Sequence, residues 1–179
     1  MACGVLLAAT PVHAEGLRAE LHGGYDRVQA DGEEADGLLY GIGVGFDQRV
    51  PDGNTFGGVE FNVDDSTARN CQRDFAVPGD RACAAVGRDL SAMFRVGFHL
   101  NEASALYVVG GYSNLRATAR YQLGTVSERE SENLNGARVG AGFQLRFGPS
   151  LYGKIEYRYT NYEQDFERHQ AVTGLGIQF

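Results

Sequence analysis

The segment that most constrains the fold is residues 171–179, which read A-V-T-G-L-G-I-Q-F. Its odd-numbered positions hold apolar or small side chains and end on the aromatic residue Phe179, while its even-numbered positions hold Val172, two glycines and Gln178. Because successive side chains of a strand point to opposite faces, this two-residue period predicts a strand with one apolar face and one face in a polar setting.

The same period occurs in seven earlier segments, so the sequence predicts eight strands in all. The connections between them are alternately long and short, beginning with a long one. This asymmetry is typical of an antiparallel up-and-down barrel with long loops at one end and short turns at the other. The fifth segment is the least regular, because residues 106–109 are apolar on both faces. The predicted strands are residues 17–26, 38–47, 58–64, 90–100, 105–121, 137–147, 151–160 and 171–179.

Composition agrees with one all-β domain and excludes some partners. A chain of 179 residues is long enough for a single small barrel. No run of 18 apolar residues occurs, so no transmembrane helix is expected. The mean hydropathy of -0.28 still allows a transmembrane barrel, in which polar inward positions offset apolar outward ones. A net charge of -7 argues against nucleic acid as a partner.

Residues 1–14 have the features of a secretion signal, and the barrel domain is expected to occupy residues 15–179. Val5 begins a short apolar stretch, and Val12-His13-Ala14 forms a small-x-small cleavage site before Glu15. The positive residues that usually begin such a signal are missing, which indicates a truncated signal. Cys3 lies in this segment without the preceding residues that a lipoprotein signal requires.

Alternation alone does not separate a transmembrane barrel, apolar outside, from a soluble lipocalin-like carrier, apolar inside. Three observations favour the membrane. The export signal is one, and the second is the abundance of glycine in the polar set, where it leaves room in a narrow lumen for long neighbouring side chains. Third, the four strands that run toward the short-turn end all finish on phenylalanine in the apolar set, which predicts an aromatic girdle at one membrane interface. These phenylalanines are Phe46, Phe98, Phe147 and Phe179.

Residues 154–159, K-I-E-Y-R-Y, followed by the closing strand, resemble the eight-stranded outer-membrane barrels of the OmpA-like and opacity-protein type. The resemblance covers residues 17–179 and implies a monomer in the outer membrane of a Gram-negative bacterium, in contact with lipid and lipopolysaccharide. It implies a structural or surface-antigen role, with adhesin-like binding of a host-surface or matrix ligand through four extracellular loops. It also implies that the barrel assembly machinery recognises the C-terminal strand ending at Phe179. No cofactor is expected.

Charged residues of both signs occupy the polar set of the strands. Charges inside a barrel must be paired or solvated, so we expect a network of ion pairs in the lumen. The alternative is a narrow porin-like channel, although eight strands leave an interior only wide enough for side chains. The predicted network consists of Glu20, Glu60, Arg95, Arg138, Arg146, Lys154, Glu156 and Arg158, with His22, Asp64 and His99 on the same face.

An enzyme that modifies lipid A is a further alternative, because some barrels of this size use a histidine and a serine near the outer leaflet. His99 is predicted at the short-turn end, His22 in mid-strand, and His169 at the outer end of the last strand. No serine occurs at a spacing that would make it a nucleophile partner of His169. We therefore expect no catalytic activity.

Cys71 and Cys83 share one predicted outer loop, residues 65–87, in an oxidising compartment, which predicts a disulfide. No further ligands that would make a metal site are evident near them. A second predicted outer loop carries the acidic residues Asp31, Glu33, Glu34 and Asp36, whose spacing matches no calcium loop. We expect these carboxylates to be solvated.

Overall fold

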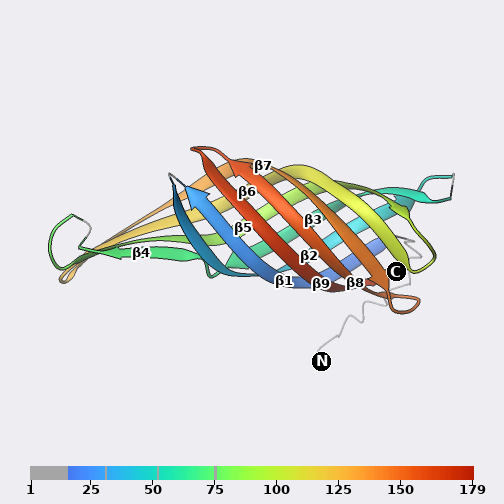
Figure 1. Cartoon of the computed structure of the whole chain (residues 1–179), viewed down its shortest axis with the longest axis horizontal. Coiled ribbons are helices and arrows are strands. Elements are labelled where there is room, and N and C mark those ends of the chain that lie inside the picture. Colours follow the sequence, from blue (N-terminus) through green and yellow to red (C-terminus); the bar gives the residue numbers. More distant parts are fainter. Residues whose placement is uncertain (1–15, 31, 52, 75) are drawn as a thin grey trace, which may run out of the picture.

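The computed structural model describes residues 16–30, 32–51, 53–74 and 76–179, and the predicted secretion signal lies outside these ranges. All regular elements are antiparallel strands (Figure 1). No helix with the length and hydropathy of a membrane span occurs in this part of the chain. The strands are β1 (Leu17–Ala30), β2 (Glu33–Arg49), β3 (Thr55–Ser66), β4 (Arg69–Arg73), β5 (Asp80–His99), β6 (Ser104–Leu123), β7 (Val126–Arg146), β8 (Leu151–Tyr162) and β9 (Phe166–Gln178).

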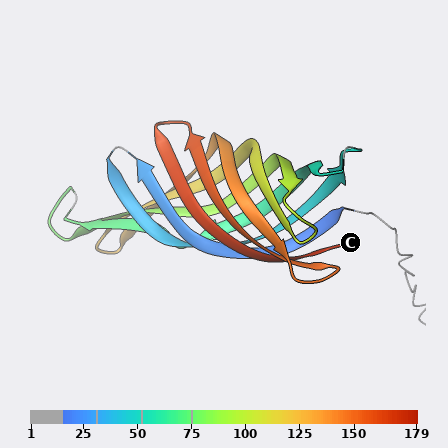
Figure 2. The same cartoon turned by 45° about the vertical axis from the view of Figure 1, so that its right-hand side comes forward.

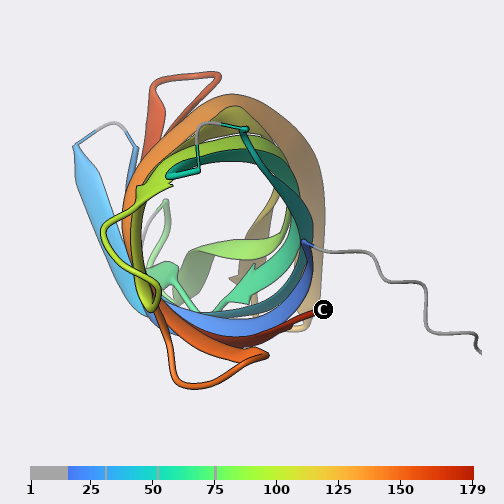
Figure 3. The same cartoon turned by 90° about the vertical axis from the view of Figure 1, so that its right-hand side faces the viewer.

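Eight of the nine strands close a barrel. Neighbours in sequence pair with each other, and β1 pairs with β9, as in Leu21 opposite Leu175. β3 pairs directly with β5, so β4 is not part of the ring. The view along the axis shows the closed ring (Figure 3). The prediction of an eight-stranded up-and-down barrel is therefore confirmed, and β4 is an additional short strand that pairs with β5 beyond the ring.

Side chains alternate between the two faces of the barrel wall as the two-residue period predicts. Leu175 on β9 is 61% exposed, while Val172 and Gln170 on the opposite parity are 3% and 0% exposed. The irregular segment of β6 follows the same rule, because Leu106 and Val108 point outward and the inward position between them is Tyr107. The apolar set thus forms the outer belt of the barrel, as a transmembrane barrel requires.

The strands at the long-loop end are longer than predicted. The acidic segment after residue 30 continues the β1–β2 ladder to the pair Ala30 and Glu33, and β6 and β7 continue to the pair Leu123 and Val126. The predicted loop at residues 65–87 is largely the β4–β5 hairpin. The sequence missed β4 and the outer part of β7 because both faces of these segments are polar, so no two-residue period marks them, while backbone hydrogen bonds still continue the ladder.

We call residues 69–73, 80–88, 116–123 and 126–133 the outer extension. They belong to β4, β5, β6 and β7 and form a four-stranded sheet that continues the barrel wall. Figures 1 and 2 show the β4–β5 and β6–β7 hairpins projecting well beyond the β1–β2 and β8–β9 hairpins. On the side of these two shorter hairpins, the inner face of the extension is therefore open above the barrel mouth.

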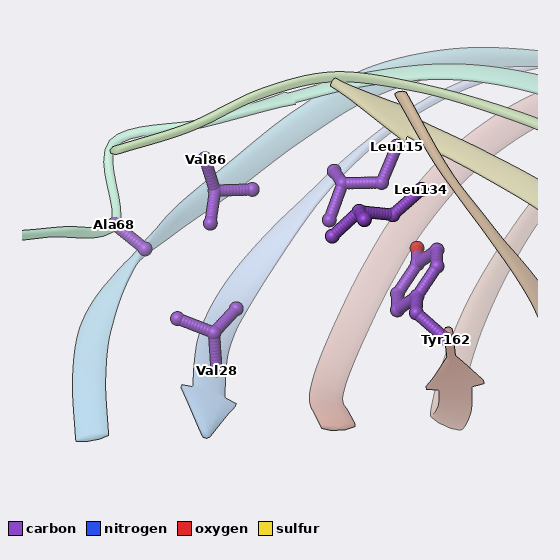
Figure 4. Close-up of a cluster of buried hydrophobic side chains, with 6 residues drawn as sticks. All are labelled: Val28, Ala68, Val86, Leu115, Leu134 and Tyr162. Atoms are coloured by element: carbon purple, nitrogen blue, oxygen red, sulfur yellow. The ribbon is translucent and has the colours of Figure 1, made fainter. Parts of the chain in front are cut away.

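The barrel interior contains two apolar clusters. One lies at the outer mouth and receives side chains from most of the strands around the ring (Figure 4). The other lies toward the short-turn end and includes Phe56, Met93 and Tyr107. Between and beside these clusters the buried side chains are mainly charged. The mouth cluster consists of Val28, Ala68, Val86, Leu115, Leu134 and Tyr162, with Ala35, Ala117 and Phe166 packed against it.

Candidate functional site

The centre of the lumen holds a network of buried ion pairs. The Nζ atom of Lys154 lies 2.5 Å from Glu20 and 3.5 Å from Glu60. Arg18 donates a hydrogen bond of 2.9 Å to Glu60. Arg158 pairs with Glu156, with Glu60 and, at 3.3 Å, with Asp64. Arg18 also lies 3.0 Å from Asp47 and 3.6 Å from Glu20, so each of these three cations has more than one carboxylate partner, which compensates for the loss of water around it.

The network continues to the outer mouth through two further arginines. Arg138 pairs with Asp89 and approaches Asp64 at 3.9 Å. Arg168 lies 2.7 Å from the same Asp89 and binds Asp26 through two hydrogen bonds. Both arginine side chains are fully buried. The mouth cluster described above adjoins these charges, and Tyr162 belongs to both, because its hydroxyl donates to Asp89.

At the short-turn end the network stops at Arg95. Its guanidinium lies 3.7 Å from the ring centroid of Tyr107 and 5.2 Å from that of Phe56. Its Nη atoms reach Asp47 at 3.2 Å and Gln144 at 2.7 Å. The aromatic rings and the two polar partners hold this cation in place, so side chains fill this part of the lumen as well.

Seven of the eight residues predicted for the network lie in it: Glu20, Glu60, Arg95, Arg138, Lys154, Glu156 and Arg158. The prediction for Arg146 was wrong. Its side chain is half-buried at the end of β7 and forms no ion pair with another described residue. His99 is also only half-buried, beside Phe56.

Sequence reasoning did not include Arg18, Asp26, Asp47, Asp89 and Arg168 in the network. Arg168 and Asp89 lie just outside the predicted strands, yet they keep the parity of the inward residues that follow them, Gln170 and Ser91. Extending each strand by its own period would have found both. The next inward residue of β5 beyond Asp89 is Val86, three positions earlier. The two-residue period does not reach it, because the pairing of β5 with β6 shifts register between Val86 and Asp89.

Glycines of β2 lie where long side chains cross the lumen. A Cβ atom at Gly41 would lie 2.1 Å from Asp64 Oδ1 and 2.8 Å from His22 Nε2. At Gly43 it would lie 2.4 Å from Asn62 and 3.0 Å from Glu20. These positions leave the room that the ion-pair network occupies, as the abundance of glycine in the polar set indicates.

The histidines show no catalytic arrangement with serine in the part of the chain described. His22 is buried, with Nε2 2.5 Å from Asp64 and Nδ1 3.2 Å from Glu20, so it belongs to the lumen network. His169 lies on the outer wall, where its Nδ1 is 2.7 Å from the hydroxyl of Tyr157 and its ring is 5.0 Å from that of Tyr159. No cluster of three potential metal ligands occurs among the described residues.

The four predicted girdle residues are exposed on the outer wall near the short-turn end: Phe46, Phe98, Phe147 and Phe179. Exposed tyrosines lie toward the other end of the wall, namely Tyr25, Tyr112 and Tyr157. Aromatic residues at both ends of an apolar belt are typical of a barrel that crosses a membrane.

The outer extension has one strongly basic face. The buried residues Ala68, Val86, Leu115 and Leu134 fix which parity points toward the barrel axis, and the opposite parity points outward. Across one outward row, the pair Cys71 and Cys83 is followed by Arg120 and Arg129. No Asp or Glu occupies the outward positions of these four strands. The exposed arginines of this face, which we call the arginine face, are Arg69, Arg73, Arg81, Arg116, Arg120 and Arg129.

Cys71 and Cys83 form the predicted disulfide across neighbouring strands of the extension. Beyond it, the β4–β5 turn is held by Asp80, which accepts hydrogen bonds from the backbone amides of Ala76 and Val77. The hydroxyl of Tyr121 also donates to Asp80, at 2.9 Å, and this hydrogen bond raises the pKa of the Tyr121 phenol above its ordinary value. The extension is thus cross-linked covalently and by hydrogen bonds.

A family model described as "Outer membrane protein beta-barrel domain" matches residues 1–179. Among curated proteins, the 25 kDa outer-membrane immunogenic protein of Brucella ovis is 28% identical over 122 residues, which are 68% of this chain and 55% of that protein. Outer membrane protein P1 of Coxiella burnetii is 32% identical over 78 residues, or 43% of this chain and 31% of that protein. The match therefore spans about half or less of the length of these relatives.

Solved structures of small outer-membrane barrels have the same fold. Ail, the attachment invasion locus protein of Yersinia pestis, in complex with the heparin analogue sucrose octasulfate, superposes with a TM-score of 0.61 at 19% identity, covering 92% of this chain and 99% of that one. Neisserial surface protein A superposes with a TM-score of 0.62 at 15% identity, covering 92% of this chain and 97% of that one. At these identities the likeness shows the fold alone.

Proposed function

Because this chain belongs to the outer membrane protein β-barrel domain family, and therefore lies in the outer membrane of a Gram-negative bacterium, we propose that it is a surface protein that binds polyanionic glycans. The arginine face carries this proposal. Six exposed arginines occupy outward positions of the outer extension, and no carboxylate accompanies them. This local charge is opposite in sign to the net charge of -7 of the whole chain.

The chemistry of arginine favours sulfated or phosphorylated sugars as the ligand. A guanidinium donates two parallel hydrogen bonds to a tetrahedral or planar oxyanion, which a lysine ammonium does not. Arg120 and Arg129 are directly opposite each other on β6 and β7, next to the disulfide. Because the strands are braced by Cys71 and Cys83, little conformational freedom is lost when a ligand binds.

Two sources of polyanion fit this face. Arg69 and Arg116 lie nearest to the barrel, at the height at which phosphate groups of lipopolysaccharide in the outer leaflet would meet the wall, while Arg73, Arg81 and Arg129 lie further out. We assign the distal arginines to a sulfated glycan of the host surface or matrix. The Ail barrel of the same fold was solved with a heparin analogue, which supports a sulfated sugar as the ligand class.

The proposal also covers assembly and activity. The closing strand β9 presents Thr173, Leu175 and Ile177 outward, and we expect the barrel assembly machinery to recognise this strand and the barrel to act as a monomer. No catalysis is assigned, because His22 is held inside the ion-pair network and His169 contacts tyrosines on the outer wall.

The alternative function, a narrow porin-like channel, has one feature in its favour, which is the continuous line of charges along the lumen. Against it, Leu115 and Leu134 of the mouth cluster are buried across the opening, and Arg138, Arg158 and Arg168 have fully buried side chains. An ion would have to displace both the apolar cluster and paired arginines. The filled lumen therefore favours binding at the surface over transport.

The proposed function is tested by binding of a heparin oligosaccharide to the barrel in lipid nanodiscs. R120Q/R129Q removes two adjacent charges of the arginine face, and we expect about tenfold weaker binding, from two exposed ion pairs of up to about 1 kcal/mol each. E128Q/E130Q changes the same hairpin on its opposite face and should bind no more weakly than the wild type. Binding should weaken with salt.

Two results would contradict the proposal. One is equal binding of the oligosaccharide and its desulfated form. The other is unchanged affinity in R120Q/R129Q. Nanodiscs with and without lipopolysaccharide distinguish the two sources of polyanion, because occupancy of Arg69 and Arg116 by lipopolysaccharide should leave glycan binding at the distal arginines unchanged.

A further inference from the structure

The inner face of the outer extension and the mouth of the barrel enclose a cavity of about 1050 Å³. This volume is at the upper end of the range of small-molecule pockets. Ten of its 23 lining residues are alanine or valine, and one side is formed by Phe166 on β9. Most of the lining residues that belong to the extension are on its inward parity, although Arg69, Arg120 and Arg129 of the arginine face also line the cavity.

The cavity is closed at its base. Leu115 and Leu134, which are 0% and 5% exposed, lie across the barrel below it together with Tyr162 (Figure 4). Beneath this cluster, Arg168 joins Asp26 and Asp89. A molecule can therefore enter from outside the cell but finds no passage into the lumen, so the cavity is a cup rather than the start of a channel.

The wall of the cup is built from small residues placed side by side. Ala84 lies opposite Ala119, and Val86 lies opposite Ala117, on adjacent strands. Alanine is a poor strand former, so local propensity does not explain a row of alanines here. What the row provides is an apolar surface with space in front of it. A ligand bound against these alanines would bury its own apolar surface there, in place of the contacts that larger side chains would make.

The charged residues on the inward parity of the extension are acidic. Glu130 is directly opposite Ala119, and Glu128 is directly opposite Tyr121, both on the inward parity of β7. Neither glutamate forms an ion pair with another residue of the described chain. On β2, Glu33 accepts a hydrogen bond of 3.1 Å from Asn70. Positive side chains of the four strands of the extension lie on the outward parity, so the cup combines apolar walls with unpaired negative charge.

We propose that this cup binds small amphipathic cations, with an apolar body against Ala84 and Ala119 and an ammonium group at Glu128 and Glu130. The observation that carries this inference is the separation of charge across one sheet: glutamates and alanines on the inner face, arginines on the outer face. This inference does not rest on the proposed glycan binding, because its glutamates and alanines are on the inward parity of the extension and the arginines are on the outward parity.

The test uses three matched probes on the folded barrel in nanodiscs: 4-phenylbutylammonium, 4-phenylbutanol and 4-phenylbutanoate. They share one apolar body and differ in charge. Carbon-13 labelling of alanine methyl groups reports directly on the wall of the cup through Ala84 and Ala119. Lipid-facing Ala92 and Ala141 report on partitioning of the probes into the bilayer.

We expect saturable shifts at Ala84 and Ala119 with the cation, weaker binding of the alcohol and the weakest binding of the carboxylate. E128Q/E130Q should weaken cation binding about threefold and leave the alcohol unaffected. A84F/A119F, which fills the cup, should abolish the saturable shifts of the remaining cup alanines Ala82 and Ala117 with all three probes. The proposal is overturned by equal affinity for the three probes, by unchanged cation affinity in E128Q/E130Q, or by shifts at Ala84 that only follow those at Ala141.

Discussion

Arg168 and Asp26 join the last strand of the barrel to the first. The Nε and Nη2 atoms of Arg168 donate hydrogen bonds of 2.7 and 2.8 Å to the two carboxylate oxygens of Asp26. Both side chains are fully buried, and they are 142 positions apart in the sequence. This bidentate pair lies on the lumen side of the β1–β9 pairing that closes the ring.

Loss of this pair should destabilise the whole barrel. In R168A the carboxylate of Asp26 remains buried without its cation and Asp89 keeps only Arg138, which should cost about 3–5 kcal/mol. Urea-induced unfolding in lipid vesicles measures this loss. The control is R27A on the outer wall of β1, whose partner Asp36 is exposed, and its unfolding should change little. Equal stability of R168A and the wild type would show that the pair does not hold the ring closed.

The assignment of faces predicts a dependence on depth. Val96 is 54% exposed on the outer wall, so V96R would place a charge in the hydrocarbon and should cost about 2–4 kcal/mol near the midplane. Leu100 lies past the end of β5, where L100R should cost only about 0–1 kcal/mol. Unfolding titrations in vesicles measure both. Equal costs at the two positions would contradict the lipid-facing assignment.

The disulfide predicts a local effect on the outer extension. Cys71 and Cys83 are 12 residues apart, and closing a loop of this length contributes about 3 kcal/mol in the chain-entropy model. C71S/C83S should therefore increase amide exchange in β4 and the outer half of β5, while exchange in the barrel strands stays slow. Exchange measured by mass spectrometry reports both regions. Faster exchange throughout β1 and β9 would show instead that the disulfide supports the whole fold.

Topology is tested by labelling of single cysteines in a C71S/C83S background. Glu130 lies on the outer extension, and Ser150 lies in a short turn at the other end. E130C should react with an impermeant reagent on intact cells, and S150C only after permeabilisation. The reverse pattern would place the outer extension in the periplasm.

The sequence was sufficient for the transmembrane part of the fold. In β9, the period from Ala171 to Ile177 shows which side chains face lipid, because the hydrocarbon and the lumen select opposite residue types at alternate positions. The same selection predicted the inward charges of β8, Lys154, Glu156 and Arg158. These residues could be found because the sequence of each strand alternates between residues suited to the hydrocarbon and residues suited to the lumen.

Beyond the membrane this selection is absent. Residues 126–133 meet water on both faces, so their pattern indicates a polar loop, although they pair with residues 116–123 of β6, most of which lie within a predicted strand. The arginine face and the cup therefore could not be predicted, because they depend on which residues of β4, β5, β6 and β7 become neighbours. The pairing of Arg168 with Asp26 was likewise hidden, since it depends on closure of the ring rather than on any local signal.

The most direct test of the central claim, that this barrel acts by binding at the surface and its lumen is filled, is the conductance of the refolded protein in a planar lipid bilayer. The mouth cluster and the ion pairs of Arg138, Arg158 and Arg168 predict no steady open state at moderate voltage. A steady open level in the wild type, reproduced in every refolded preparation, would contradict the filled lumen and support the narrow channel instead.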